Sequence, residues 1–462
     1  MRWKTQCGVF GIHGRGDVTE LIYLGLYALQ HRGQEGAGLV THDGEKTRPL
    51  RGLGLVSDVM PPRARRSVPG YLGIGHVRYA TTGKATRLRN VQPILVDYKG
   101  GKLAVAHNGN FTNAKELHEE LERDGSIFQT TTDSEILLHL AARSKRRTLS
   151  EQLMEGLERI EGACTLVAMN EEVLIGYRDP HGFRPLILGD KDGMGILASE
   201  TCALDITGAR FVREIEPGEM VLLDGRTVTT LGRRPPMRRA FCMFEQIYFA
   251  RPDSRVFGES VNAVRRRLGH LLAQRHPVEA DIVIAVPDSS NSAALGYAEA
   301  SGLAFELGLI RNHYIGRTFI QPDQGDRTDS VKIKFNAVRE LLEGQRVVLV
   351  DDSIVRGTTS RKLVHLLFEA GATEIHVRVS APPITGPCYY GIDTPDKDEL
   401  IASRMDVEGI RRYIGATSLG YLTEEDLRAA VSAPEDYCLA CFNGSYPTRV
   451  PEEARTLLFD RD

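Results

Sequence analysis

Continuous apolar runs separated by helical patterns mark the second half of the chain. Residues 347–350 form a β-branched run that two acids end abruptly, and residues 282–286 form a similar run; a further strand is predicted at 375–379. Short runs of this kind predict strands buried on both faces of a parallel sheet. Apolar residues recur at helical spacing between these runs, at 292–301 and 361–370. The alternation predicts a parallel sheet with helices on its faces.

The first half interleaves shorter strands with amphipathic helices. Strands are predicted at 7–12, 38–40, 73–77, 103–106, 164–169, 174–177 and 220–223, and helices at 17–30, 113–124, 133–143 and 149–160. Such interleaving favours two sheets with helices outside them. The charged, proline-bearing stretch 232–239 is the best linker, and a helix at 259–274 follows it. Roughly the last 60 residues are predicted to be irregular.

Composition limits the classes of function. A chain of 462 residues is long enough for two or three domains. Its net charge of -3 gives no bulk attraction to nucleic acid or to an anionic membrane. No apolar run reaches the ~18 residues of a membrane span, and residues 1–6 lack the apolar region of a signal peptide. A cytoplasmic protein is expected, so its seven cysteines point to catalysis, metal binding or core packing.

The polar residues that follow the 347–350 run are the first candidate site. Asp351 and Asp352 end the predicted strand, and small and hydroxyl residues at 356–360 precede the predicted helix. Ligands bind beyond the carboxyl ends of parallel strands, and a helix N-terminus attracts phosphate. Residues 356–360 can therefore surround a monophosphate, leaving the two acids to hold ribose hydroxyls or Mg2+. The alternative is an ordinary turn with a Ser or Thr helix cap.

The order of these residues, DDSIVRGTTS at 351–360, resembles the phosphoribosyl-diphosphate (PRPP) motif of type I phosphoribosyltransferases. The resemblance implies a doubly wound parallel sheet and a Mg2+-dependent displacement of pyrophosphate from ribose C1. Residues 316–335 resemble the loop that closes over PRPP. The implied PRPP contacts are Asp351, Asp352, Ser353, Arg356, Gly357, Thr358, Thr359, Ser360 and Lys332. Residues 287–302 resemble the first loop of that domain, which adds Ser289 to the two aspartates as a Mg2+ residue, although Ser289 also suits a helix cap.

Cys7 beside Gly8, at the head of a predicted strand, is the second candidate. If residues 1–6 were removed, the α-amine of Cys7 would be free to accept the thiol proton, directly or through water. The alternative is a small buried cysteine near a chain end.

Five segments around this cysteine resemble the glutaminase domain of N-terminal-nucleophile amidotransferases, an αββα sandwich. They are CGVFGI at 7–12, HRGQE at 31–35, GHVRYATTG at 75–83, HNGN at 107–110 and TTDSE at 131–135. The resemblance implies that Arg78 binds the α-carboxylate of glutamine and Asp133 its α-ammonium. It also implies that Asn108 and the Gly109 N–H form the oxyanion hole.

A chain that combines these two domains resembles the amidophosphoribosyltransferases, also called glutamine PRPP amidotransferases. That family implies a propeptide at 1–6, a glutaminase domain at 7–235, a phosphoribosyltransferase domain at 236–430 and a C-terminal segment at 431–462. It implies that ammonia from glutamine passes internally to PRPP, giving 5-phosphoribosylamine, pyrophosphate and glutamate at the start of purine synthesis. Purine nucleotides as feedback inhibitors and a homotetramer are implied as well.

Four cysteines remain once Cys7 is set aside and the surroundings of Cys164 and Cys202 are read as core packing. They are Cys242, Cys388, Cys438 and Cys441. One Cys-x-x-Cys is compatible with zinc or with a redox pair. The segments FCMFE, GPCYYGID and YCLACFNG resemble the 4Fe-4S ligands of the cluster-bearing branch of the family, which implies a structural cluster rather than an electron-transfer centre.

Two other classes of function remain open at this point. A different glutamine-dependent enzyme would share the first domain but would lack DDSIVRGTTS. A non-enzymatic regulator could keep a PRPP-binding fold but would not need the candidate glutaminase residues together.

Overall fold

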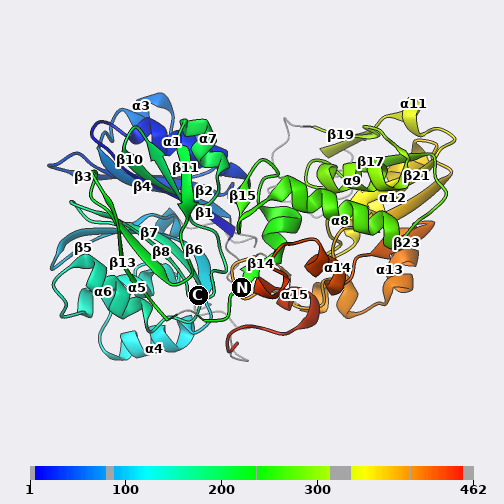
Figure 1. The fold of residues 1–462 in the computed structure, drawn as a ribbon. Helices are drawn as coiled ribbons and strands as arrows, with labels where there is room; N and C mark the ends of the chain where they lie inside the picture. Colours follow the sequence, from blue (N-terminus) through cyan, green and yellow to red (C-terminus); the bar gives the residue numbers. More distant parts are fainter. Residues whose placement is uncertain are drawn as a thin grey trace.

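The computed structural model describes residues 6–79, 88–235, 237–312, 334–392, 394–395 and 397–450. Figure 1 shows a part built of β1–β13 beside a part that contains β17–β23, with β14 and β15 between them. Among the described residues no helix has both the length and the apolar character needed to cross a bilayer.

The first sheet has seven antiparallel strands in the order β11-β9-β10-β1-β4-β2-β3. They are β1 Gln6–His13, β2 Gly36–His42, β3 Thr47–Leu53, β4 Leu72–Tyr79, β9 Ile187–Lys191, β10 Met194–Ala198 and β11 Arg210–Glu214. Helices α1 (Thr19–Ala28) and α7 (Cys202–Thr207) cover its outer face. Ile22 and Leu204 from these helices belong to the same buried cluster as Phe10 of β1.

The second sheet has six strands in the order β13-β12-β8-β7-β6-β5. They are β5 Ile94–Tyr98, β6 Gly101–Phe111, β7 Gly162–Met169, β8 Leu174–Arg178, β12 Glu219–Leu223 and β13 Val228–Arg233. Its outer face packs on α4 (Ala114–Arg123), α5 (Ser134–Arg143) and α6 (Leu149–Leu157). Val9 and Ile74 of the first sheet form one buried cluster with Ala106 and Val167 of the second. The result is the αββα sandwich that the resemblance implied.

The third sheet is parallel, with strand order β18-β17-β21-β22-β23. Its strands are β17 Ile282–Ala285, β18 Ala304–Phe305, β21 Arg346–Asp351, β22 Glu374–Val379 and β23 Ser418–Tyr421. Helices α8 (Val261–Arg275) and α9 (Asn291–Ser301) pack on one face. Helices α12 (Thr358–Glu369) and α13 (Val407–Ile414) pack on the other. This confirms the predicted doubly wound parallel sheet.

The end of the chain is more regular than its sequence predicted. The prediction of an irregular tail is wrong, because α13, β23 and α14 (Glu424–Ala429) all lie in it. β23 pairs with β22 and completes the parallel sheet. Its sequence, SLGY, is short and carries a glycine, so no apolar run marked it. Helix α12 also begins at Thr358, three residues before the predicted start at 361.

The segment just after the linker lies beside the tail. β14 (Phe241–Cys242) and β24 (Tyr437–Cys438) form a two-stranded parallel sheet. α15 (Ala440–Asn443) follows β24 directly. The remaining short elements are η1 Gln30–Arg32, α2 Val56–Val59, α3 Pro62–Arg65, η2 Leu88–Asn90, η3 Glu245–Phe249, β15 Arg255–Val256, β16 Glu259–Ser260, β19 Leu309–Arg311, β20 Phe335–Ala337, α11 Arg339–Leu342, η5 Lys397–Glu399, η6 Ile401–Ser403 and η7 Pro434–Asp436.

Candidate active site

Cys7 and Arg78 lie opposite each other on two paired strands. In the register of β1 and β4, Cys7 is the partner of Arg78. Both are buried, and Nη1 of Arg78 has no hydrogen-bond partner among the described residues. Burial lowers the pKa of Arg78, and the negative charges of Cys7, Glu35 and Asp133 oppose that shift. A buried guanidinium with an unused donor beside a thiol is suited to an anionic ligand.

Asn108 and Gly109 lie in β6, which belongs to the other sheet. Asn108 is fully buried, and neither its Nδ2 nor its Oδ1 has a hydrogen-bond partner within the described part of the chain. Gly109 has a φ of +152°, and a Cβ there would collide with the carbonyl oxygen of Ala163 on β7. The positive φ and the nearby carbonyl therefore both require glycine at this position. Leaving a buried amide unpaired costs about 1–3 kcal/mol, so the arrangement favours a ligand that bonds to it.

Asp133 directly precedes α5 but does not cap it. Its side chain makes no capping hydrogen bond. Instead Oδ2 accepts the N–H of Phe111 at 3.0 Å, and Oδ1 lies 3.7 Å from Nδ1 of His107. The carboxylate is thus held against β6, the strand that carries Asn108. Together with its interaction with Arg78, this places the predicted glutamine-binding residues around one site.

Asp351 and Asp352 lie at the carboxyl end of β21. Asp352 accepts hydrogen bonds from Oγ of Ser289 at 2.5 Å and from Oγ of Ser353 at 2.7 Å. Oδ1 of Asp351 accepts the N–H of Asp352 at 2.9 Å. Burial raises the pKa of both carboxyl groups, and the charge of Asp352 adds to the shift at Asp351. Ser289, from the loop after the neighbouring strand β17, therefore lies beside the acids, and its role at a Mg2+ site stays a prediction.

The loop after these acids leads into α12, so Thr358, Thr359 and Ser360 form its first turn, next to Gly357. The first N–H groups of a helix have no partner inside the helix, which makes them suitable donors to phosphate. Arg356, predicted to contact PRPP, pairs with Glu399, with Nη2 at 2.6 Å from Oε2. Lys332 and most of the predicted closing loop lie outside the described residues, as do residues 1–5.

The four remaining cysteines come together from three segments. The pairing of β14 with β24 sets Cys242 opposite Cys438. The carbonyl of Cys441 accepts the N–H groups of Thr385 and Gly386, each at 3.0 Å, which brings the segment of Cys388 alongside. Cys441 interacts electrostatically with the other three. Cys164 and Cys202 are buried in the cores, as predicted. In the described ranges no group of three or more His, Cys, Asp or Glu residues is arranged to hold a single metal ion.

A buried ionic network joins the sandwich to η3, just after the linker, and sequence reasoning did not single it out. Nη2 of Arg32 lies 2.6 Å from Oε2 of Glu245, and Nη1 of Arg184 lies 3.0 Å from Oε1 of the same carboxylate. Arg32 also pairs with Glu200, and all four side chains are fully buried. The available signal was a charge inside the apolar stretch FEQIYF at Glu245, because a buried charge needs a partner.

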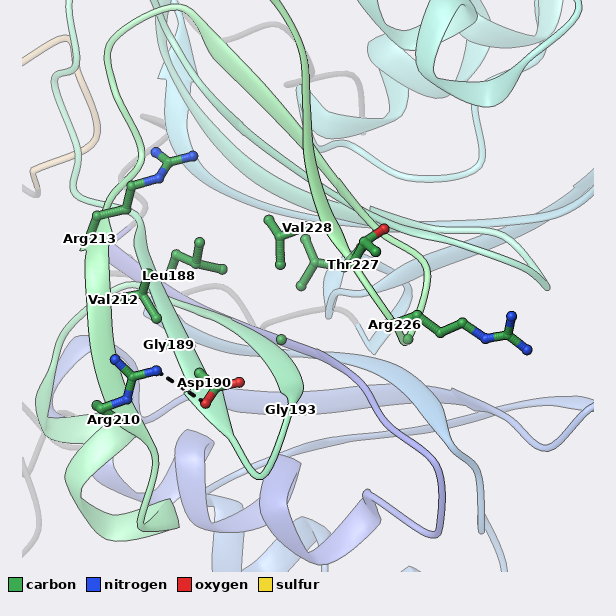
Figure 2. A pocket seen from close by; sticks show the side chains of 13 residues that line it. Leu188, Gly189, Asp190, Gly193, Arg210, Val212, Arg213, Arg226, Thr227 and Val228 are labelled. Carbon is green, nitrogen blue, oxygen red and sulfur yellow. Dashed lines mark hydrogen bonds and ion pairs between the residues drawn. The ribbon is translucent and has the colours of Figure 1, made fainter.

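A cavity of 430 Å³ opens elsewhere on the sandwich, between β9–β11 and the turn from β12 to β13. Figure 2 shows Arg210, Arg213 and Arg226 around it, with Arg210 paired to Asp190 at 3.5 Å. Gly225 of its lining packs near His13. His13 ends β1, and Cys7 lies near the start of that strand. The cavity is therefore remote from the candidate glutamine site.

Comparison with known proteins identifies close relatives along the whole chain. It is 50% identical over 454 residues to the amidophosphoribosyltransferase of Bacillus subtilis, covering 97% of this chain and 95% of that protein. It is 49% identical over 453 residues to chloroplastic amidophosphoribosyltransferase 2 of Arabidopsis thaliana, covering 97% and 81%. A model of the glutamine amidotransferase domain matches residues 76–205.

Solved structures agree with these relatives. A glutamine PRPP amidotransferase from B. subtilis, complexed with ADP and GMP, superposes with a TM-score of 0.91 at 49% identity, covering 97% of this chain and 98% of that one. A structure described as the allosteric regulatory enzyme of purine biosynthesis gives a TM-score of 0.92 at 49% identity, covering 97% of both chains. Such identity over nearly the full length, with the same fold, shows that the chain belongs to the amidophosphoribosyltransferase family.

Proposed function

We propose that each part of the molecule carries out one half of the reaction that this family performs in purine biosynthesis, the glutamine-dependent transfer of nitrogen to PRPP. The sandwich releases ammonia from glutamine, and the parallel-sheet part uses that ammonia. The observation that carries the first half is a pair of unused buried donors, one on Arg78 opposite Cys7 and one on Asn108 of β6. Arg78 binds the α-carboxylate of glutamine, and Asp133 binds its α-ammonium.

Cys7 is the nucleophile in this proposal. Its sulfur attacks the side-chain amide carbon, and the thiol proton passes to the departing nitrogen, so that ammonia leaves and a glutamyl thioester remains. Nδ2 of Asn108 and the N–H of Gly109 stabilise the negative oxygen formed during the attack. Water then hydrolyses the thioester to glutamate and restores the thiol. Removal of residues 1–6 supplies the α-amine that accepts the thiol proton.

The acids at the end of β21 hold the second substrate. Asp351 and Asp352 with Ser289 offer oxygen ligands, which Mg2+ prefers, and two buried carboxylates need a nearby cation to stay charged. Bound Mg2+ would offset the charge that develops on the departing pyrophosphate. The first turn of α12 binds the 5-phosphate, and ammonia attacks C1 of the ribose. Arg356, which pairs with Glu399 in the structure, is proposed to contact PRPP, and Lys332, outside the described residues, is proposed to contact it as well.

Cys242, Cys388, Cys438 and Cys441 hold a 4Fe-4S cluster in this proposal. Each iron of such a cluster takes one thiolate, so the ligands need not converge on a single ion. The quartet joins the linker, the segment after β22 and the tail, which supports a structural role. Zinc and electron transfer remain the alternatives to test.

We further propose a cytoplasmic homotetramer that purine nucleotides inhibit. The support for inhibition is the B. subtilis relative solved with ADP and GMP. The tetramer and the location rest on the family resemblance and on composition.

Pyrophosphate release from PRPP tests the proposal, measured with glutamine and then with ammonium as nitrogen donor. Both donors should support release, and Mg2+ chelation should abolish it. No PRPP-dependent pyrophosphate with either donor would refute the proposed function.

A further inference from the structure

The residue after the oxyanion glycine reaches across to the other part of the chain. Nδ2 of Asn110 donates a hydrogen bond of 2.9 Å to the carbonyl oxygen of Tyr389, 279 positions away. Asn110 belongs to β6, whereas Tyr389 directly follows Cys388. The side chain of Asn110 therefore ties the strand of Asn108 and Gly109 to the loop of a candidate cluster cysteine.

The same loop touches Gly109 itself. A Cβ added to Gly391 would lie 3.1 Å from the carbonyl carbon and oxygen of Gly109 and 3.2 Å from its Cα. The two main chains are thus in direct contact. Main-chain atoms cannot move aside as a flexible side chain can, so Gly391 limits where the Gly109–Asn110 peptide and the Cα of Gly109 can lie. The N–H of Gly109 is attached to the nitrogen bonded to that Cα, so its direction is restricted in turn.

The loop is firmly held on its other side. Nε of Arg184 donates to the carbonyl of Tyr390 at 3.1 Å, and this guanidinium is fully buried. The ring of Tyr390 stacks on Phe183 with centroids 4.0 Å apart. The N–H of Tyr390 donates to Sγ of Cys388 at 3.3 Å. Residues 389–391 therefore form a fixed support rather than a loose contact.

We propose that Asn110 is a positioning residue for glutamine hydrolysis, because it fixes the Gly109 N–H through the main chain of residues 389–391. This inference rests on the proposed oxyanion role of Gly109. Oxyanion donors act through their preset geometry, so a small rotation of the Gly109 peptide lowers the rate of thioester formation. Binding of the glutamine amino-acid group, assigned to Arg78 and Asp133, does not depend on that geometry.

Asn110→Ala in the full chain tests the inference. The kcat of glutamine hydrolysis should fall by about tenfold or more, the size expected for one lost hydrogen bond that orients a donor. KM for glutamine should change by less than about twofold, and ammonia-dependent synthesis should be retained.

Asn113→Ala is the matched control. Nδ2 of Asn113 also donates to a main-chain carbonyl, that of Arg159 at 2.8 Å, but both residues belong to the sandwich. Its substitution should leave kcat within about twofold of the unchanged chain. A second variant, Gly391→Ala, inserts a methyl group against Gly109 and also strains the loop, because φ of Gly391 is +92°. Both effects displace the support of Gly109, so the same kcat should fall without loss of ammonia-dependent synthesis.

Three results would overturn the inference: an unchanged kcat in Asn110→Ala, an equal fall in Asn113→Ala, or a joint loss of glutamine- and ammonia-dependent synthesis in Asn110→Ala. The unsubstituted chain is measured first, and it must release pyrophosphate from PRPP with both donors. If it does not, the proposed function fails; if it does and the variants behave as in one of the three results, only the inference about Asn110 fails.

Discussion

Replacement of Asn108 should change kcat of glutamine hydrolysis much more than it changes the free energy of unfolding. Its amide is fully buried, yet neither polar atom has a hydrogen-bond partner among the described residues. Asn108→Ala therefore breaks no hydrogen bond in the described free protein. In the proposed mechanism, what it removes is the donor to the negative oxygen that forms during attack by Cys7. Loss of one oxyanion donor lowers kcat by about 10²–10³, which is about 2.7–4 kcal/mol of transition-state stabilisation.

The free energy of unfolding should change much less. Without a broken hydrogen bond, only packing is lost, and we expect a cost of about 1 kcal/mol. Arg184→Ala provides the contrast, because it removes one side of a fully buried ion pair with Glu245. Glu245 keeps its pair with Arg32, so the cost stays below that of a buried charge left with no partner, which is about 3–5 kcal/mol, but the variant still loses the buried bonds to Glu245 and to the carbonyl of Tyr390.

Steady-state glutamine hydrolysis and thermal unfolding of both variants test this expectation. Asn108→Ala should lose kcat at a nearly unchanged melting temperature, whereas Arg184→Ala should melt at a clearly lower temperature. A kcat of Asn108→Ala within about threefold of the unchanged chain would refute the oxyanion assignment.

Three other outcomes follow from the proposed sites. Cys7→Ala should abolish glutamine-dependent synthesis and spare ammonia-dependent synthesis, since the two chemistries lie on separate sheets; equal loss with both donors would contradict this. Asp352→Asn should remove synthesis with either donor, and retained turnover at saturating PRPP would count against the assignment. Protein purified without oxygen should contain iron and absorb broadly in the visible range, and Cys438→Ser should lose both; stoichiometric zinc without iron would reverse the choice of metal.

The sequence predicted the parts of the fold and site that local patterns encode. The β-branched run before Asp351 predicted a buried strand, and the acids at its end predicted a ligand site where β21 does end. The strand and its acids depend on a few consecutive residues and on general rules for sheets. Cys7 and Arg78 were singled out by the family resemblance of their segments, and the structure sets them opposite each other on β1 and β4.

Features that depend on distant or weakly apolar segments escaped prediction. Edge strands β11 and β13 carry several exposed positions, so no apolar alternation marked them. β14 and β24 are each two residues long, too short for a periodic pattern, and they are strands only because they pair with each other. The bond from Asn110 to Tyr389 joins positions far apart in sequence, and neither residue type signals it. Contacts of this kind follow only from the tertiary arrangement.

The buried network explains why the two parts of the molecule meet in one fixed arrangement. Arg32 comes from the sandwich, and Glu245 comes from η3 just after the linker. Two parts that slid past each other would expose or separate these charges, and an unpaired charge without water is costly. The carbonyl of Tyr390 accepts from Arg184, which also binds Glu245. The loop that contacts Gly109 is therefore held by the same guanidinium that joins the two parts, so the proposed oxyanion site should be sensitive to their relative position.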